Sequence, residues 1–424
     1  MATLLIVMAV TLLLGVPVAF AIAISGVFYL LVESSVPVLV FAQRMVVGVD
    51  SFTLLAIPLF LLAGAVMAEG GITPRIMRLA AACVGHIPGG MAVVMVLSCM
   101  LFGAISGSGV ADVAAIGSIM LPAMKNQGYK PAFSAALLGC AGSLGTIIPP
   151  SIVMVVLGVS MGVSIGKLFL GGILPGILAG GALMLISWGF SVRENYPRLE
   201  RASGKEILQA LQGALLPLLT PAIIIGGIVY GVFTATEAGA VAVLYAFVLS
   251  VFVYRKVTLR RFFEVCLEVG RTSAVVLFII AAASLFGWIL TAEDIPQKVA
   301  SFLLSVSRER WALLILFNLL LVLLGMFMET IAIILIVVPI FFPIMQQVGV
   351  DPIHFGVMIC VNLAVGANTP PLGVDLLAAC KIAGIPYEDS FRYILPFVGA
   401  MVAALALIVA FPPLVTAIPN WFMR

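Results

Sequence analysis

Charged residues are scarce in this chain. Only 9% of its 424 residues are Asp, Glu, Lys or Arg, against roughly 25% in an ordinary globular protein. A soluble chain of this length would split into several domains, and each domain would need a charged surface. The scarcity of charge therefore excludes a soluble fold. The net charge of +3 and the lack of any basic run also exclude a nucleic-acid partner.

Cysteine and histidine are few as well, which argues against a transition-metal centre. The chain has six cysteines and two histidines, and no two cysteines show the Cys-x-x-Cys spacing of a zinc or iron–sulfur site. All six cysteines lie in apolar stretches. We therefore expect structural thiols rather than disulfides or metal ligands.

Long charge-free stretches are abundant. A membrane-spanning helix needs about 20 apolar residues, whereas outer-membrane strands show short alternating patterns. The sequence therefore predicts an all-α polytopic membrane protein. The stretches without Asp, Glu, Lys or Arg are residues 2–32, 51–68, 131–166, 168–192, 207–236, 238–254, 272–292, 311–328, 330–350, 352–374 and 393–423.

Two loops concentrate the positive charge and predict the orientation. One follows residue 192 and the other follows residue 254. Two apolar segments separate these loops, so both lie on one side, and the positive-inside rule makes that side cytoplasmic. If residues 1–14 and 17–32 form two short spans, the N-terminus lies outside. We expect the C-terminus to lie outside as well, and the family resemblance described below implies that this side is the periplasm and the membrane the bacterial inner membrane.

An internal repeat relates the two halves of the chain. An offset of 221 residues pairs Pro122 with Pro343 and Pro149-Pro150 with Pro370-Pro371. Glycine and proline set backbone shape, so the repeat is one of conformation. Each half has an odd number of predicted spans, so the second half enters the membrane inverted, as in secondary transporters. The expected domains are a first repeat at 1–192, a cytoplasmic linker at 193–212 and a second repeat at 213–424.

Each half is expected to hold a re-entrant helical hairpin, at about 89–126 and about 310–348. The arms are too short, or too closely spaced, for two spans joined by a loop. Non-helical backbone at membrane depth is tolerated only where it is buried in protein or lines a cavity. We therefore expect the two hairpin tips to lie at a binding site.

Each half is also expected to hold a helix broken by two prolines, at about 131–161 and about 352–383. Successive prolines remove two amide donors, so carbonyls one turn upstream are freed. Such carbonyls, with Ser or Thr hydroxyls, can surround a small cation such as Na⁺. The half-helix that begins after each break points its positive end into the site, which suits an anionic substrate.

Four acidic residues lie in or near these apolar segments. Asp112 and Glu329 follow or occupy the hairpin tips, where each could hold an ion or cap a helix. Glu237 lies at a turn and is expected to be structural. Asp375 lies soon after the second break.

Four motifs resemble the large membrane subunit of tripartite ATP-independent periplasmic (TRAP) transporters. They are Phe102-Gly-Ala-Ile-Ser-Gly-Ser-Gly-Val-Ala-Asp112, Gly145-Thr-Ile-Ile-Pro-Pro-Ser151, Gly325-Met-Phe-Met-Glu-Thr330 and Asn362-Leu-Ala-Val-Gly-Ala-Asn-Thr-Pro-Pro-Leu-Gly373. The resemblance covers essentially the whole chain. It implies a Na⁺-driven importer of small organic anions rather than an enzyme, with substrates such as C4-dicarboxylates, sialic acid or other sugar acids. Na⁺ is the coupling ion, and no organic cofactor is implied.

The resemblance also implies a mechanism and two partners. An elevator mechanism would move the hairpins and broken helices as one domain inside a scaffold that the lipid bilayer surrounds. A small membrane subunit of four helices and a periplasmic substrate-binding protein would be separate chains.

Where its motifs match those of the family, the resemblance implies two Na⁺ sites and one substrate site in this chain. Gly103 stands where relatives often have Ser, so a hydroxyl ligand is missing from the first site. The first Na⁺ site would comprise Gly103, Ser106, Gly145 and Ile148, and the second Gly325, Gly366, Thr369 and Leu372. The substrate would lie near Ser106, Gly107, Ser108, Pro150, Asn368, Thr369 and Pro371.

Two alternative functions remain open from the sequence. One is a stand-alone anion/Na⁺ symporter of related two-hairpin architecture. The other is a proton-coupled antiporter that uses Asp112 and Glu329 as titrating groups.

Overall fold

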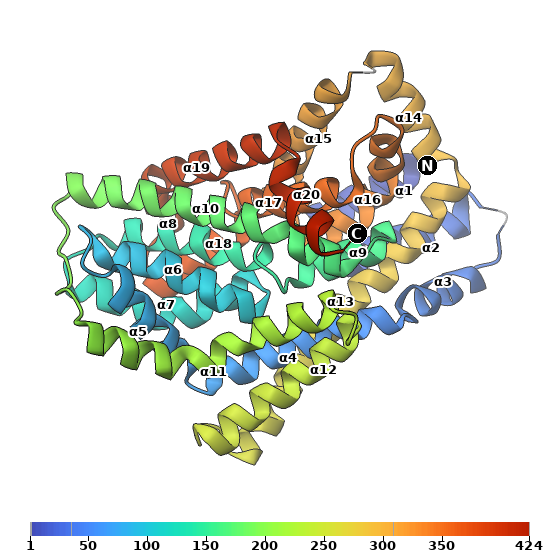
Figure 1. The fold of residues 1–424 in the computed structure, drawn as a ribbon. Coiled ribbons are helices and arrows are strands. Elements are labelled where there is room, and N and C mark those ends of the chain that lie inside the picture. The colour runs from blue at the N-terminus through green and yellow to red at the C-terminus, as the bar shows by residue number, and fades with distance from the viewer. Residues whose placement is uncertain (1, 35, 308, 424) are drawn as a thin grey trace.

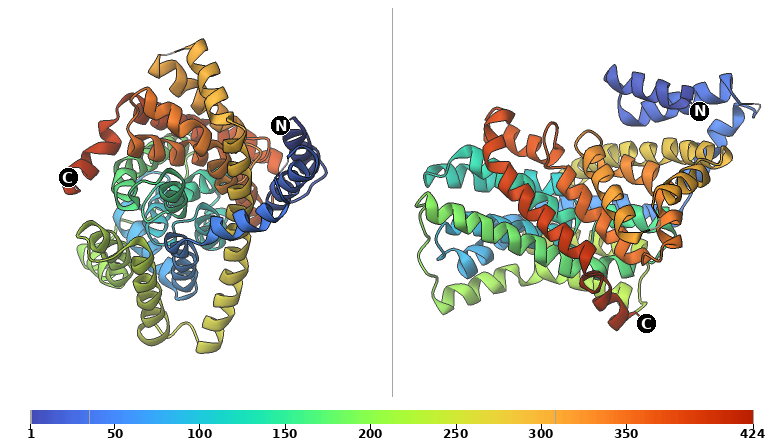
Figure 2. Two further views of the ribbon diagram at one scale, coloured as in Figure 1. Left: turned by 90° about the vertical axis from the view of Figure 1, so that its right-hand side faces the viewer. Right: turned by 90° about the horizontal axis from the view of Figure 1, so that it is seen from above.

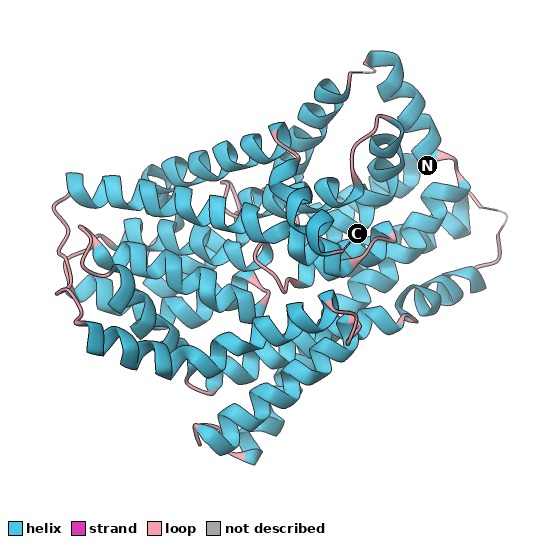
Figure 3. Cartoon of the chain, in the orientation of Figure 1, coloured by secondary structure: helices cyan, strands magenta, loops and turns pink. Residues whose placement is uncertain are grey.

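Every regular element in the described part of the chain is a helix. The computed structural model describes residues 2–34, 36–307 and 309–423, and no strand occurs among them (Figures 1 and 3). The all-helical prediction is confirmed. Seven of these helices are long and apolar enough to cross a membrane.

The first half runs as far as the long helix that precedes the first basic loop. Its elements are α1 (Ala2–Leu13), α2 (Val18–Val32), α3 (Leu39–Val49), η1 (Phe52–Leu55), α4 (Ala56–Glu69), α5 (Ile72–Val84), α6 (Gly90–Ser106), α7 (Gly109–Asn126), α8 (Pro131–Gly142), η2 (Ser143–Thr146), α9 (Ile152–Met161) and α10 (Ile165–Arg193).

The second half begins with two long helices and ends with two that pack on α10. Its elements are α11 (Gly204–Val229), α12 (Ala235–Phe247), the π-helical turn η3 (Val248–Val253), α13 (Leu259–Ala292), α14 (Ile295–Val306), α15 (Arg310–Gly325), α16 (Thr330–Gln347), α17 (Pro352–Gly366), α18 (Val374–Ala383), η4 (Tyr387–Ser390), α19 (Phe391–Ala410) and α20 (Pro413–Phe422).

Two pairs of helices are joined by tight turns. Between α6 and α7, Gly107 has a φ of 65° and its amide donates to the carbonyl of Gly103 at 3.0 Å. Glycine adopts this left-handed conformation without steric cost, so α6 can end abruptly. Between α15 and α16, Glu329 caps α16 by accepting from the amide of Ala332 at 3.1 Å. In each pair the two helices pack against each other.

The two double prolines that the internal repeat pairs with each other both interrupt helices. Pro149 and Pro150 separate η2 from α9, and Pro370 and Pro371 separate α17 from α18. Because Pro150 has no amide hydrogen, the carbonyl of Thr146 loses its helical donor. It accepts instead from the Ser151 hydroxyl at 2.7 Å. At this break a side-chain hydroxyl therefore replaces a backbone hydrogen bond that the helix would otherwise make.

The interrupted helices lie at the centre of the molecule. Residues 133–142 of α8 and 354–366 of α17 are all buried. Neighbouring helices thus surround the backbone on the upstream side of each break, as a low-dielectric membrane would require.

Peripheral helices carry most of the exposed apolar surface. α1 and α2 lie at one edge (Figure 2) and pack on α13 through a separate cluster that includes Leu4, Ile22 and Phe286. α12 packs on α4 and begins with a capping box between Thr234 and Glu237. The structural role expected of Glu237 is confirmed.

The connection between α10 and α11 is shorter than the predicted linker. Its irregular part ends at Ser203, because Ser203 and Glu206 form a capping box that starts α11. Residues 204–212 of the predicted linker at 193–212 are therefore helical. Within the connection, Glu194 pairs with Lys130 at 2.6 Å, and this hydrogen bond lowers the pKa of Glu194. The connection lies at the left of Figure 1, and both termini lie in the right half.

Candidate functional site

Each of the two helix pairs, α6–α7 and α15–α16, contacts a double-proline break through two glycines, one from the helix pair and one just upstream of the prolines. A Cβ added to Gly103 on α6 would lie 2.7 Å from the Cα of Gly145 in η2. A Cβ added to Gly325 on α15 would lie 3.0 Å from the Cα of Gly366 on α17. We call these the first and second glycine crossings. Each unites two of the four residues predicted for one Na⁺ site.

The first crossing carries several oxygen atoms suited to a hard cation. The carbonyl of Gly145 lacks helical donors, since Pro149 and Pro150 have no amide hydrogens. The Ser106 hydroxyl donates to Oδ1 of Asp112. Oδ2 of Asp112 is buried without a hydrogen-bond partner. Carbonyl, hydroxyl and carboxylate oxygens are the ligands that hard cations prefer, so the residues present fit Na⁺.

The second crossing presents hydroxyl and carbonyl oxygens. The hydroxyl of Thr369 donates to the carbonyl of Val365 at 2.7 Å, so its oxygen lone pairs remain free for a cation. The amide of Thr369 donates to the carbonyl of Gly366 at 3.0 Å. Leu372 is 48% exposed. Ser151, which the 221-residue offset pairs with Leu372, is fully buried, so the second break is the more open of the two at this position.

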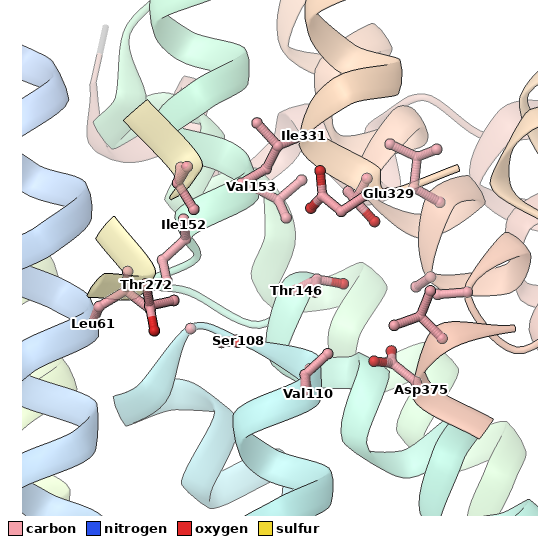
Figure 4. Close-up of a pocket in the computed structure, with 18 of the residues that line it drawn as sticks. Leu61, Ser108, Val110, Thr146, Ile152, Val153, Thr272, Glu329, Ile331 and Asp375 are labelled. Atoms are coloured by element: carbon pink, nitrogen blue, oxygen red, sulfur yellow. The ribbon is translucent and has the colours of Figure 1, made fainter. Parts of the chain in front are cut away.

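A cavity of about 310 Å³ lies between the two hairpin turns and the two breaks (Figure 4). Helices α4 and α13 close its remaining side. Its lining residues are Leu61, Gly107, Ser108, Gly109, Val110, Thr146, Ile152, Val153, Thr272, Val276, Met328, Glu329, Thr330, Ile331, Leu363, Ala364, Ala367, Val374 and Asp375.

Four helix N-termini face this cavity, those of α7, α9, α16 and α18. Ser151 caps α9 and Glu329 caps α16 with their own side chains. Neither α7 nor α18 has a side-chain cap. In α18 the amide of Asp375 donates to the carbonyl of Ala367 at 3.1 Å, which leaves fewer free first-turn amides there than in α7. Helix N-termini with free amides bind anions. None of the described residues that line the cavity is Lys or Arg, so helix N-termini are the available positive groups.

The predicted substrate residues divide into two groups. Gly107 and Ser108 line the cavity, whereas Ser106, Pro150 and Pro371 do not. The carbonyl of Pro150 lies beside Gly107, and the amide of Ile152 donates to the carbonyl of Gly107 at 3.2 Å. The first break and the first hairpin turn are thus tied together.

The remaining two predicted substrate residues, Asn368 and Thr369, also lie outside the cavity lining. The side-chain amide nitrogen Nδ2 of Asn368 donates to the carbonyl of Ala364 at 2.9 Å. The side-chain oxygen Oδ1 of Asn368 lies beside Gly139 on α8. Asn368 therefore joins the second break to the first interrupted helix. The structure gives it a packing position behind the cavity wall.

Several lining residues were not among the predicted ones. Thr146 and Thr330 stand inside the motifs already singled out, so the signal for them was present. Leu61 on α4 and Thr272 on α13 belong to no motif. Only the packing of α4 and α13 beside the hairpin turns brings them to the cavity (Figure 4).

The three central carboxylates differ in their surroundings. Glu329 caps α16 and also lines the cavity. Asp375 is almost fully buried, and its carboxylate faces the cavity (Figure 4). Asp112 is fully buried, makes no capping bond to α7, and lies at the first crossing.

Comparison with known proteins identifies relatives along nearly the whole chain. The C4-dicarboxylate TRAP transporter large permease protein DctM of Pseudomonas aeruginosa is 43% identical over 401 residues, 95% of this chain and 94% of that one. The sialic acid TRAP transporter large permease protein SiaM of Vibrio cholerae is 40% identical, covering 96% of each chain. The isethionate TRAP transporter permease protein DctMQ of Oleidesulfovibrio alaskensis is 41% identical over 98% of this chain, which spans 65% of its length.

Two solved structures share the fold at low sequence identity. They are the YdaH transporter of Alcanivorax borkumensis, with a TM-score of 0.60, 18% identity and 86% of each chain covered, and MtrF of Neisseria gonorrhoeae, with a TM-score of 0.61, 15% identity and 90% and 85% covered. The model of the family "Tripartite ATP-independent periplasmic transporter, DctM component" matches residues 5–414. Together with the relatives, this match shows that the chain belongs to the DctM family, the large permeases of TRAP transporters, and is a membrane transport protein rather than an enzyme.

Proposed function

We propose that this permease is a Na⁺-coupled secondary importer of small organic anions. The observation that supports this most directly is one cavity lying between two glycine crossings, with the uncapped N-termini of α7 and α18 facing it. The crossings offer oxygen ligands for cations, and the helix N-termini offer donors for an anion. The cation sites and the anion site share the same hairpins and breaks. Binding of Na⁺ can therefore fix the position of the helix N-termini that bind the anion.

The substrate carries at least one anionic group. Relatives are named for C4-dicarboxylate, sialic acid, isethionate and 2,3-diketo-L-gulonate, which share an acidic group and small size. In this chain the carboxylates of Glu329 and Asp375 face the same cavity. Both would repel an anion. Asp375 lies in the first turn of α18, and its Oδ2 lies beside Gly109 at the start of α7. The substrate's acidic group therefore has to reach the free amides at the start of α7 on the side away from Asp375.

The two halves are arranged as inverted repeats that work as an elevator in the bacterial inner membrane. The helix pairs α6–α7 and α15–α16 are the re-entrant hairpins, and they move with the two interrupted helices. The long outer helices α4, α11, α12 and α13 form the scaffold. The basic α10–α11 connection, at the left of Figure 1, faces the cytoplasm, so the termini, both in the right half of that view, face the periplasm.

Two partner proteins complete the transporter. The TRAP family membership supports a small four-helix membrane subunit and a periplasmic substrate-binding protein. The exposed apolar surfaces of the outer helices are large enough to hold a membrane subunit as well as lipid.

Coupling to Na⁺ is tested by uptake into proteoliposomes that contain this chain, the small subunit and the external binding protein. Radiolabelled succinate, sialic acid and isethionate serve as probe solutes. We expect uptake of the solute that the binding protein accepts under an inward Na⁺ gradient, and background uptake when choline replaces Na⁺. Na⁺-independent uptake driven by a pH gradient would instead support the proton-coupled antiporter.

The second ion site is tested by Thr369→Ala. The variant removes one hydroxyl ligand while the carbonyls stay in place, so we expect a several-fold rise in the Na⁺ concentration for half-maximal uptake. The melting temperature without Na⁺ should change little, since the hydroxyl makes a single hydrogen bond, to the carbonyl of Val365 one turn upstream in α17. An unchanged Na⁺ dependence would remove Thr369 from the site.

A further inference from the structure

Asp112 is a buried carboxylate without a cationic partner. Its side chain is fully buried, and the Ser106 hydroxyl donates to Oδ1. Oδ2 has no hydrogen-bond partner, and no Lys or Arg among the described residues pairs with either oxygen. The other titratable groups nearby are Asp375 on α18 and Cys99 on α6, and neither supplies positive charge. Burial of an unpaired carboxylate is costly, so this one calls for a cation.

The unpartnered oxygen lies at the first glycine crossing. A Cβ added to Gly103 would lie 2.8 Å from Oδ2 of Asp112, and a Cβ added to Gly145 would overlap the same atom. The carboxylate therefore occupies the space into which a side chain at either position would project. Gly103 contributes no hydroxyl to this site, and Asp112 places an oxygen where such a hydroxyl would lie.

Helix capping does not account for Asp112. Helix α7 has no side-chain cap, and the amide of Asp112 donates to the carbonyl of Ser108 at 3.0 Å as part of the first helical turn. Oδ1 of the carboxylate bonds to the Ser106 hydroxyl, which accepts from the amide of Ser108. Oδ2, by contrast, lies beside Gly103 on α6 and Gly145 in η2. The two roles left open by the sequence are thus distinguished by the direction of the side chain.

The second crossing has no matching carboxylate. A Cβ on Gly325 would approach only backbone atoms of Gly366, and a Cβ on Gly366 only those of Gly325. Glu329, the nearest acidic residue in that hairpin turn, uses Oε2 to cap α16. The two crossings are therefore alike in backbone and different in charge.

We propose that Oδ2 of Asp112 is a ligand of Na⁺ at the first site and supplies its negative charge. This inference rests on the proposed Na⁺ coupling. The carboxylate replaces a missing neutral ligand at Gly103, and the Ser106 hydroxyl orients it by holding Oδ1. The first site then binds Na⁺ as a neutral pair, whereas the second site relies on carbonyls and the Thr369 hydroxyl alone.

The test is Na⁺ binding by the full chain in lipid nanodiscs, measured as the rise in melting temperature when NaCl replaces choline chloride at constant ionic strength. The Thr369→Ala background weakens the second site, so the remaining Na⁺ effect reports on the first. In that background we expect Asp112→Asn to raise the Na⁺ concentration for half-maximal stabilisation about tenfold or more, because a charge-assisted contact is lost. Asparagine keeps the size of the side chain and an acceptor for Ser106.

Asp351→Asn is the matched control. It removes one carboxylate from the cap of α17, at the opposite end of that helix from the break, and asparagine still caps. We expect its Na⁺ dependence to equal that of the background. If Asp112→Asn does not fold, Asp112→Ala provides the same comparison, because it also removes the oxygen ligand and adds no bulk.

Each outcome discriminates between the inference and the function on which it rests. If Na⁺ and choline stabilise the unmodified chain equally, the proposed Na⁺ coupling fails. If Na⁺ stabilises that chain, and Asp112→Asn leaves the half-maximal concentration unchanged in the Thr369→Ala background, only the role of Asp112 is overturned. A purely structural Asp112 would lower the melting temperature in choline and leave the Na⁺ dependence as it was.

Discussion

Uptake is expected to fall to background when either partner protein is omitted from proteoliposomes that contain this permease and a Na⁺ gradient. The physical reason is weak retention of the solute. Only α7 and α18 present uncapped N-termini to the cavity, and each interaction of this kind contributes about 0.3 to 2 kcal/mol. Such a site needs the high local solute concentration that a docked binding protein provides. The measurement is initial uptake of the probe solute with and without each partner.

The control for this experiment is a vesicle without the permease but with both partners, which must also show background uptake. Robust uptake by this chain alone, under the same Na⁺ gradient, would favour the stand-alone symporter. In that event the substrate would have to bind the cavity tightly, and a direct binding measurement on the purified chain would detect it.

Gly366→Ala is expected to abolish Na⁺-dependent uptake. A Cβ at this position would lie 2.8 Å from the Cα of Gly325 and 3.1 Å from its carbonyl carbon. Both are backbone atoms, so the second hairpin and the second break must separate to make room. Overpacking of this kind costs about 1–3 kcal/mol and displaces the carbonyls that the second ion site needs. The measurements are uptake and Na⁺-dependent thermal stabilisation of the purified variant.

Gly399→Ala is the matched control for Gly366→Ala. Gly399 lies within α19, and a Cβ there would meet no atom within 4 Å. Alanine favours a helix over glycine by up to about 1 kcal/mol, so this variant should be as stable as the unmodified protein and should transport normally. Normal Na⁺ dependence in Gly366→Ala would show that the second crossing is not an ion site.

The positions of helix ends and breaks could be predicted because they depend on local chemistry. Two consecutive prolines cannot continue a helix, whatever surrounds them. Gly107 ends α6 because only glycine adopts its conformation without strain. The start of α11 also depends on local chemistry, because Ser203 and Glu206 form a capping box there.

The detailed lining of the cavity could not be predicted in the same way. Asn368 and Thr369 stand in the second break, but their side chains bond to carbonyls of α17 and do not reach the cavity. Leu61 and Thr272 reach it from helices that carry no motif. Side-chain direction depends on which helices pack beside a break, and motif spacing does not contain that information.

The sequence by itself determined the class of the protein, the places where its helices break and its membership in a transporter family. Scarce charge requires a membrane, and glycine and proline act on the backbone locally. Only the tertiary structure shows where the Asp112 carboxylate lies, because its position along the chain suits capping and ion binding equally. The crossing of α6 with η2 brings Gly103 and Gly145 around its free oxygen, and contacts between residues so far apart exist only after the helices have packed.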